Sequence, residues 1–345
     1  MTNTGFDYLS HDLPPLVWLE HAYYVPKGII SKHDVIYDQD GRLIKASCLL
    51  RGPTLEEDQS QAPPVLPETI SDCGLPSLSG AYVFLGDFMT AHFGHMITEG
   101  IARFWSLADP ALSDTRVLCN RAPRGIRETI RRIVKPDESH WHCLLDCFGL
   151  ARNRFAVSAA PIRLARVAVP SASWLERHRV HSAHLQTTRK LASFLTKGRE
   201  IPKDPRPVYF SRTKLTKANL FYDREIEVED ACRRQGWKIV YPERLTLAAQ
   251  AELANTHDIF AGCVGSAFHT LLFRMDDVPL HCVYLGVERT YPNYLMMDQL
   301  LQAHSEYVPC IVRSDKSERH RAIVLEKALP ALTLLLSRTT ATLAR

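Results

Sequence analysis

The stretch Asp258-Ile259-Phe260-Ala261-Gly262-Cys263-Val264-Gly265-Ser266 decides the fold class, because a short apolar run ends there in a glycine-rich turn that opens onto a helical pattern. Strand and helix alternate in the same way through the whole second half of the chain. We expect strands at 208–211, 238–241, 258–261 and 280–285, and helices at 224–235, at 247–255 and from Ser266. This alternation implies parallel strands with right-handed crossovers, a doubly wound α/β sheet whose ligands lie beyond the carboxyl ends of the strands.

Polar and basic residues follow three of these expected strands. They are Ser211, Arg212 and Lys214 after the first, Glu243 after the second, and Gly265 and Ser266 after the third. A Gly-Ser turn that opens a helix presents free N–H groups and the positive end of the helix dipole, so with Arg212 and Lys214 beside it we expect a diphosphate site. The alternative is an ordinary glycine turn with a serine N-cap and basic residues on the surface.

The first half contains a second chemical pattern. After an expected strand at 82–85, a helix over 92–108 would bury one apolar stripe and place His95, Glu99 and Arg103 on another face at i, i+4 spacing. There Glu99 would raise the basicity of His95, and Arg103 would keep Glu99 ionised. The alternative is that these three residues form the solvent-exposed polar face of an ordinary amphipathic helix.

The rest of the chain divides around a proline-rich segment. We place a domain boundary at 197–207, because its three prolines and polar residues suit neither helix nor central strand. The expected domains are an N-terminal α/β domain at 1–196, a Rossmann-like domain at 203–312 and a helical tail at 313–345. In the first domain we expect an irregular first 80 residues with a variable loop at 51–76, strands at 116–119, 154–157 and 165–169, and helices at 125–134, 139–148 and 170–196.

The tail from Glu318 to Arg345 predicts one or two helices with a break at Pro330. Its leucines would pack against a domain. The alternative is docking on the inner membrane surface, with Arg338 and Arg345 facing anionic lipid.

Composition excludes several classes of protein. With 345 residues, 46% hydrophobic and 23% charged, the chain suits a two-domain globular protein. The net charge of +4 is too small and too dispersed for nucleic-acid binding. We find no signal peptide and no apolar stretch of about twenty residues, and we interpret the nine cysteines as reduced thiols in a cytoplasmic protein.

Two further clusters have weaker interpretations. His140, His142, Cys143 and Cys147 offer metal ligands, but a helix would place the cysteines on one face and the histidines elsewhere, so we expect no zinc site. Cys263 and Ser266 lack a Gly-x-Ser-x-Gly elbow, which makes a hydrolase the weaker hypothesis.

The order of motifs over residues 80 to 275 resembles that of the family-61 glycosyltransferases of the capsular-polysaccharide and xylan type. The resemblance lies in Phe93-Gly94-His95 with Glu99 and Arg103, Tyr209 to Arg212, Arg224-Glu225, Gly236 to Val240, Pro242-Glu243, Leu247, Gln250 and Gly262 to Ser266. The chain departs from the family pattern at Met96, Ala102 and Val264, where an aromatic residue, a proline and a histidine are usual.

The resemblance implies a GT-B fold, in which two Rossmann-like domains face each other across a cleft. It implies an inverting, metal-independent hexosyl or pentosyl transfer from a nucleotide sugar, UDP-linked in our interpretation, to a glycan or lipid-linked glycan in capsule or exopolysaccharide synthesis. Such a protein would be cytoplasmic, with a possible peripheral contact at the inner membrane. By resemblance His95 and Glu99 belong to the catalytic helix, and Arg212, Gly265 and Ser266 to the phosphate site.

The resulting hypothesis makes His95 or Glu99 the base that deprotonates the acceptor hydroxyl. Arg103 and Asp87 would line the acceptor side of the cleft. Ser211, Arg212, Lys214, Gly265 and Ser266 would hold the donor, with Glu243 on its ribose. Because Val264 removes an expected polar contact to the donor, a non-catalytic nucleotide-sugar-binding scaffold is the alternative.

Overall fold

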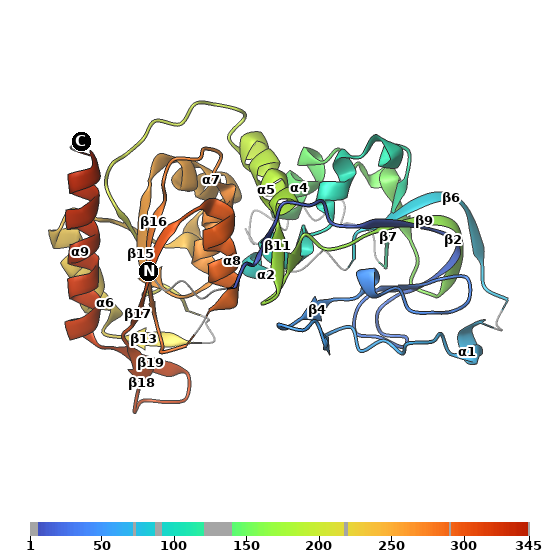
Figure 1. The fold of residues 1–345 in the computed structure, drawn as a ribbon, viewed down its shortest axis with the longest axis horizontal. Coiled ribbons are helices and arrows are strands. Elements are labelled where there is room, and N and C mark those ends of the chain that lie inside the picture. Colours follow the sequence, from blue (N-terminus) through green and yellow to red (C-terminus); the bar gives the residue numbers. More distant parts are fainter. Residues whose placement is uncertain are drawn as a thin grey trace. The chain divides into compact units, whose positions relative to one another are not determined.

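The computed structural model describes residues 6–71, 74–86, 92–120, 140–216, 220–289 and 291–343 (Figure 1). Its internal contacts divide the chain into two compact units. The N-terminal unit comprises residues 8–191, and the C-terminal unit comprises residues 192–345 together with the first seven residues. Both units combine sheets with helices, so the prediction of an α/β protein is confirmed.

The N-terminal unit is built on a six-stranded mixed sheet of order β3-β2-β9-β6-β7-β8. The strands are β2 (Leu16–Val25), β3 (Val35–Tyr37), β6 (Ser77–Phe84), β7 (Arg116–Cys119), β8 (Phe155–Val157) and β9 (Ile162–Pro170). β6 pairs in parallel with both β9 and β7, whereas β2 runs antiparallel to β9 and β3. The end of β6, Tyr82 to Phe84, is fully buried because elements cover both faces of the sheet there.

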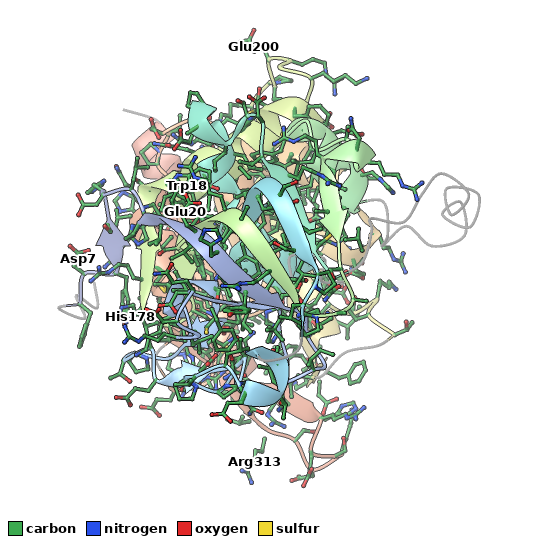
Figure 2. All side chains as sticks on the ribbon, turned by 90° about the vertical axis from the view of Figure 1, so that its right-hand side faces the viewer. Asp7, Trp18, Glu20, His178, Glu200 and Arg313 are labelled. Carbon is green, nitrogen blue, oxygen red and sulfur yellow. The ribbon has the colours of Figure 1, made fainter. Side chains whose placement is uncertain are left out.

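One face of β2 reaches solvent. Trp18 and Glu20 project from it (Figure 2), and Arg166 of β9 contacts both: its guanidinium lies 4.2 Å from the Trp18 ring centroid and its Nε 3.2 Å from Glu20 Oε1. Leu19 packs against the core cluster, and so do Ala22 and Tyr24 further along the strand, so the alternation changes phase at His21, whose φ is +53°.

The segment after β6 is not the continuous helix that the sequence predicts. It consists of one α-helical turn, α2 (Phe93–His95), a π-helix, η2 (Met96–Gly100), and a 3₁₀ helix, η3 (Phe104–Ala108). The wide turn is closed by the Ile101 N–H, which bonds to the Met96 carbonyl five residues earlier. Ile97, Ile101 and Phe104 are buried as predicted, but the changed helical period turns the residues after Gly100 away from the face that carries His95.

Two other predictions in this unit are wrong. The expected helix over 170–196 begins as a hairpin, β10 (Trp174–Leu175) and β11 (Arg179–His181), and only α5 (Ser182–Leu195) is helical. β1 (Leu9–Ser10) pairs with β11. The expected loop at 51–76 holds a second hairpin, β4 (Leu50–Arg51) and β5 (Glu57–Asp58), and a short helix, α1 (Glu68–Ser71).

Most of the other elements expected in this unit lie at their predicted positions. Helix α4 (His140–Cys147) and the strands β7, β8 and β9 occupy the predicted places. The helix expected at 125–134 lies outside the described residues. Short 3₁₀ turns, η1 (Lys45–Ser47), η4 (Pro110–Leu112) and η7 (Arg152–Arg154), complete the unit.

The C-terminal unit contains a five-stranded, all-parallel sheet of order β14-β12-β15-β16-β17. The strands are β12 (Val208–Phe210), β14 (Lys238–Val240), β15 (Ile259–Cys263), β16 (His281–Gly286) and β17 (His304–Pro309). The first four confirm the predicted strands and the doubly wound sheet. In chain order the sheet runs 2-1-3-4-5, so its topological switch point lies between β12 and β15.

Helices cover both faces of this sheet (Figure 1). α6 (Glu225–Arg234) and α9 (Leu325–Leu343) pack in one apolar cluster on the sheet, while α7 (Leu247–Thr256) and α8 (Pro292–Leu301) lie on the other side. The helix expected from Ser266 is a 3₁₀ helix, η9 (Ser266–Phe273). A small second sheet, β13-β19-β18, joins Phe221–Asp223, His320–Ile323 and Ile311–Arg313.

The tail begins with strand β19 and continues as one helix, α9, so helix does not start at Glu318 as predicted. The predicted break at Pro330 is also wrong, because α9 continues through this proline. Leu332 and Leu335 of α9 are buried in the sheet's core cluster, and Leu329 and Leu336 pack against it. Among the described residues, no helix combines the length and the apolar character that crossing a bilayer requires.

Candidate active site and phosphate site

His95 ends the α-helical turn α2 and projects into a pocket of about 370 Å³ in the N-terminal unit. Its backbone N–H lies 3.4 Å from Nδ1 of His92, the N-cap of the turn, and the two imidazole rings are 4.9 Å apart. The side chain of His95 is 43% exposed, so one edge of its ring is open to a ligand in the pocket.

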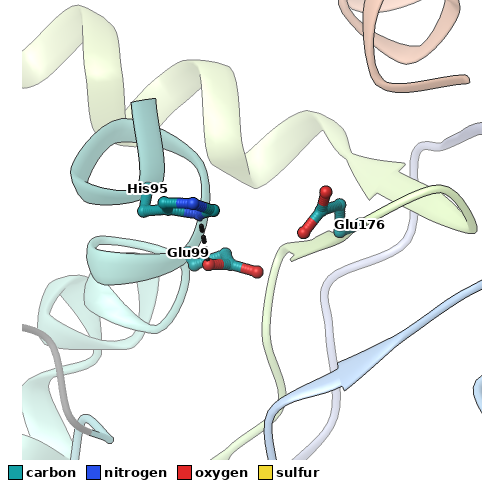
Figure 3. Close-up of side chains that lie close together, drawn as sticks. All are labelled: His95, Glu99 and Glu176. Carbon is teal, nitrogen blue, oxygen red and sulfur yellow. Dashed lines mark hydrogen bonds and ion pairs between the residues drawn. The ribbon is translucent and has the colours of Figure 1, made fainter. Parts of the chain in front are cut away.

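Glu99 stands one turn later and holds His95 in place (Figure 3). Its Oε2 lies 2.8 Å from His95 Nδ1. Arg51 binds the same carboxylate in a fork, with Nε 2.7 Å from Oε1 and Nη2 2.9 Å from Oε2. Both carboxylate oxygens are therefore occupied, and the Glu99 side chain is only 11% exposed.

These contacts set the protonation states. Burial raises the pKa of Glu99, but the hydrogen bonds from His95 and Arg51 outweigh it and lower that pKa to about 2. The hydrogen bond to Glu99 raises the pKa of His95 against the opposing effect of burial. Since Glu99 is ionised and only accepts, Nδ1 of His95 carries the proton, and neutral His95 presents the lone pair of Nε2. No group within the described residues bonds to Nε2.

Sequence reasoning missed Arg51 and Glu176. Arg51 lies in the β4–β5 hairpin, and its Nε is also 2.7 Å from Glu176 Oε2 in the β10–β11 turn. The Gly52 N–H donates to the Glu176 carbonyl at 3.0 Å, and Arg177 pairs with Glu57, so the hairpin and the turn are bound to each other. These contacts join residues more than a hundred positions apart, and two-residue strands leave no periodicity that would reveal them.

Arg103 does not occupy the role that its spacing predicted. It is buried, and its guanidinium donates to the carbonyls of Pro170 (3.0 Å), Ala46 (2.7 Å) and Cys48 (3.1 Å). Burial lowers its pKa to about 10. Arg103 lines the floor of the His95 pocket, while Arg51 is the cation that keeps Glu99 ionised. Asp87, the other residue predicted on the acceptor side, lies outside the described residues.

Three side chains here have the composition of a metal site. One ligand atom from each of His95, Glu99 and Glu176 lies within 4.8 Å of the others. However, Arg51 Nε lies 2.7 Å from an oxygen of each carboxylate, so its guanidinium occupies the space between them and balances one of their two negative charges. A metal ion would have to displace this guanidinium, so the donor set does not fit a cation while Arg51 stays in place.

The C-terminal unit brings Arg212 and Gly265 together at its switch point. Phe210 pairs with Gly262, so Arg212 leaves β12 at the level where Gly265 leaves β15. A Cβ on Gly265 would lie 2.6 Å from Arg212 Nη1, so a larger residue there would force the arginine head group to move. Ser266 follows at the start of η9, where backbone N–H groups lack helical partners.

The Arg212 guanidinium has no carboxylate partner among the described residues. Nη2 donates to the Leu220 carbonyl at 3.2 Å, the group lies 5.3 Å from the Tyr222 ring centroid, and Nε is buried without a partner there. Beneath it, Glu225 accepts the Arg212 backbone N–H at 3.0 Å, and burial raises the pKa of Glu225 to about 7. An uncompensated guanidinium beside a glycine turn is suited to bind an anion.

The structure places the other predicted donor residues apart from this pair. Ser211 is fully buried and donates to Glu229 Oε2 at 2.8 Å, inside a network with Thr213 and Tyr241. Lys214 and Glu243 are exposed, and across the described ranges no hydrogen bond or ion pair joins either to Arg212.

Comparison with known proteins identifies the family. The model of the glycosyltransferase 61 family matches residues 93–281, more than half of the 345 residues. The chain belongs to this family. A search of curated proteins returned no match. As a glycosyltransferase, this protein acts with a nucleotide-sugar donor and a glycan acceptor.

The matched segment of this glycosyltransferase begins at Phe93, so it includes His95, Glu99, Arg212, Gly265 and Ser266. Arg51 lies before it. The partner that fixes Glu99 therefore comes from a part of the glycosyltransferase that the family match does not cover.

The cysteines of α4 do not contribute to a metal centre in the structure as described. Cys143 and Cys147 are half-buried, and Cys147 Sγ lies 3.7 Å from the Lys190 carbonyl. Burial raises the pKa of both thiols, to about 11 for Cys147. Asp38 and Asp40 are two residues apart, the spacing of an Asp-x-Asp metal motif. They form a turn in which Asp38 Oδ1 accepts the N–H groups of Asp40 and Arg42.

Proposed function

We propose that this glycosyltransferase transfers a sugar with inversion from a nucleotide sugar to a glycan hydroxyl, and that Nε2 of His95 is the general base. The geometry of His95, Glu99 and Arg51 carries this proposal. Glu99 is a poor base, because both its oxygens are bonded and its pKa is lowered to about 2. His95 has a raised pKa and an Nε2 atom available in the pocket.

In the proposed step the acceptor hydroxyl gives its proton to Nε2 while its oxygen forms a bond to the anomeric carbon. The bond from that carbon to the diphosphate oxygen breaks on the opposite face, and its electron pair leaves with the nucleoside diphosphate. Attack from the opposite face inverts the anomeric centre. Glu99 stabilises the imidazolium that forms, as a carboxylate does for histidine in other acid–base pairs.

The leaving diphosphate is assigned to Arg212 and to the backbone N–H groups at Gly265 and Ser266. The guanidinium supplies positive charge where negative charge builds up, which supports transfer without a metal ion. Lys214 and Glu243 stay in the proposal as outer contacts to phosphate and ribose, because both lie exposed after strands β12 and β14.

For the transfer to occur, the donor and acceptor sites must face one another. We propose the GT-B arrangement, with the N-terminal unit on the acceptor side, a UDP-linked donor and a role in polysaccharide synthesis in the cytoplasm. A peripheral membrane contact could not use Leu332 or Leu335, which are buried in the protein core, whereas Leu334 of the same helix is exposed.

The test incubates the purified protein with candidate nucleotide sugars and glycan acceptors, and measures nucleotide release and glycan product. We expect donor-dependent release with product, and a loss of about a hundredfold or more in His95→Ala. His11→Ala, an exposed histidine outside the pocket, is the control.

Each other result has a definite meaning. Wild-type turnover in folded His95→Ala protein would remove the base assignment. Nucleotide release without glycan product would indicate a hydrolase, and binding without release would indicate a scaffold.

A further inference from the structure

Glu176 belongs to the tight turn between β10 and β11, and its side chain lies beside the His95–Glu99 pair (Figure 3). One nitrogen of His95, one oxygen of Glu99 and one oxygen of Glu176 lie within 4.8 Å of one another. The Glu176 side chain is 21% exposed, compared with 11% for Glu99. A ligand bound at His95 is therefore within reach of the Glu176 carboxylate.

The turn that carries Glu176 is held on both sides. The His178 N–H closes it by donating to the Leu175 carbonyl at 2.9 Å. The β4–β5 hairpin binds it twice, because the Gly52 N–H donates to the Glu176 carbonyl at 3.0 Å and Nδ1 of His178 lies 2.7 Å from the Pro53 carbonyl. Since these contacts fix the backbone, the Glu176 side chain starts from a defined position and loses little freedom when a ligand binds.

The charges around Arg51 favour a ligand that donates hydrogen bonds. Arg51 supplies one positive charge for the two carboxylates of Glu99 and Glu176. It binds Glu99 through both Nε and Nη2, whereas its ion pair with Glu176 runs through Nε. A carboxylate can accept about four hydrogen bonds, so this ion pair leaves Glu176 able to accept another. Excess negative charge beside the base repels an anionic group and attracts a hydroxyl group.

We propose that Glu176 accepts a hydrogen bond from a second hydroxyl group of the acceptor sugar, adjacent to the hydroxyl that His95 deprotonates. The inference rests on the proposed function, in which Nε2 of His95 takes the acceptor proton. Adjacent hydroxyl groups on a sugar ring lie close together in fixed directions, so His95 and Glu176 can bind one each. The acceptor is then an uncharged sugar with two neighbouring free hydroxyl groups, and Glu176 orients its ring for attack.

The experiment measures kcat/KM for transfer to the methyl glycosides of glucose, galactose and mannose. It then uses the monodeoxy analogues, each lacking one hydroxyl group, of the glycoside that accepts best. In the wild type, loss of the hydroxyl adjacent to the attacking one should lower kcat/KM by about tenfold or more, as loss of a hydrogen bond to a charged group does. In Glu176→Ala the parent glycoside and this analogue should react about equally. Glu176→Gln keeps an acceptor oxygen and should restore part of the preference.

The matched control is Glu56→Ala, which removes an exposed carboxylate from the loop between β4 and β5 and should keep the wild-type preference. If Glu176→Ala lowers kcat/KM equally for the parent glycoside and every analogue, Glu176 is structural and this inference is wrong, while the assignment of His95 stands. Transfer to a polymeric glycan but to none of the methyl glycosides would also overturn it, because a single ring would then not be held. If the wild-type protein transfers sugar to no acceptor, the proposed function falls together with this inference.

Discussion

The His95 pocket and a smaller pocket of the C-terminal unit, about 210 Å³ between Tyr222, Tyr291, Arg289 and Arg321, differ in how their cations are neutralised. In the first, Arg51 is bound by Glu99 and Glu176, His95 by Glu99, and Arg103 by three carbonyls. In the second, Arg212 and Arg289 face tyrosine rings and, among the described residues, no carboxylate. The first pocket has its charges arranged in advance for proton transfer, whereas the second has positive charge that an anionic ligand would neutralise.

The largest effect should come from the buried arginine of the first pocket. Arg103→Met removes the donor of three carbonyl oxygens, and each unsatisfied buried group costs roughly 1–3 kcal/mol, so the free energy of unfolding should fall by about 3 kcal/mol or more. Urea denaturation measures it. Arg212→Met, whose guanidinium donates to one carbonyl, should cost about 1 kcal/mol. Equal losses would show that Arg212 is also a structural arginine.

A second large effect is expected on catalysis. Glu99→Gln removes the charge that holds His95 and lets an amide N–H face Nδ1, which favours the tautomer without a lone pair on Nε2. We expect kcat/KM to fall by about a hundredfold or more. Glu20→Gln, an exposed carboxylate of the same unit (Figure 2), is the control and should keep full activity. Wild-type kcat/KM in Glu99→Gln would exclude Glu99 from the site.

The sequence predicted these two regions unequally well. Strands β12, β14, β15 and β16 follow from apolar runs between helical patterns, because a parallel sheet buried on both faces leaves continuous hydrophobic segments. Arg212 and Gly265 were therefore placed correctly, since the ends of neighbouring parallel strands must meet.

The surroundings of His95 were harder to predict. The i, i+4 spacing of His95 and Glu99 predicted their contact correctly, since four residues still make about one turn there. The π-helix that follows altered the period, so Arg103 turned into the core. Arg51 and Glu176 come from hairpins whose strands are two or three residues long, and such strands are defined by tertiary hydrogen bonds rather than by any pattern of their own. The same reason hid Tyr222 and Arg321, which come from the three- and four-residue strands β13 and β19 of the small sheet.

A smaller effect should distinguish Arg51 as a tuning residue. The positive charge of Arg51 lowers the pKa of His95, against the larger opposing effect of Glu99. In Arg51→Leu that pKa should rise further, so that on acidification His95 becomes protonated at a higher pH than in the wild type. The acid limb of the kcat/KM profile should therefore move to higher pH. The pH–rate profile measures this shift. Arg177→Leu breaks a neighbouring ion pair to Glu57 and should leave the acid limb in place; an unmoved limb in Arg51→Leu as well would contradict the role.

The smallest effect concerns the two cations that follow β12. Lys214 is exposed and forms no hydrogen bond or ion pair among the described residues, whereas Arg212 is held against Gly265 and Tyr222. Since an exposed ammonium on a flexible stem gains little from one ion pair, Lys214→Ala should change UDP affinity by less than about threefold. Calorimetric titration of Arg212→Ala with UDP should show a loss of about tenfold or more. If both substitutions weaken binding equally, the diphosphate is held by the general positive charge of this edge, and the fixed geometry of Arg212 beside the glycine turn is not what selects it.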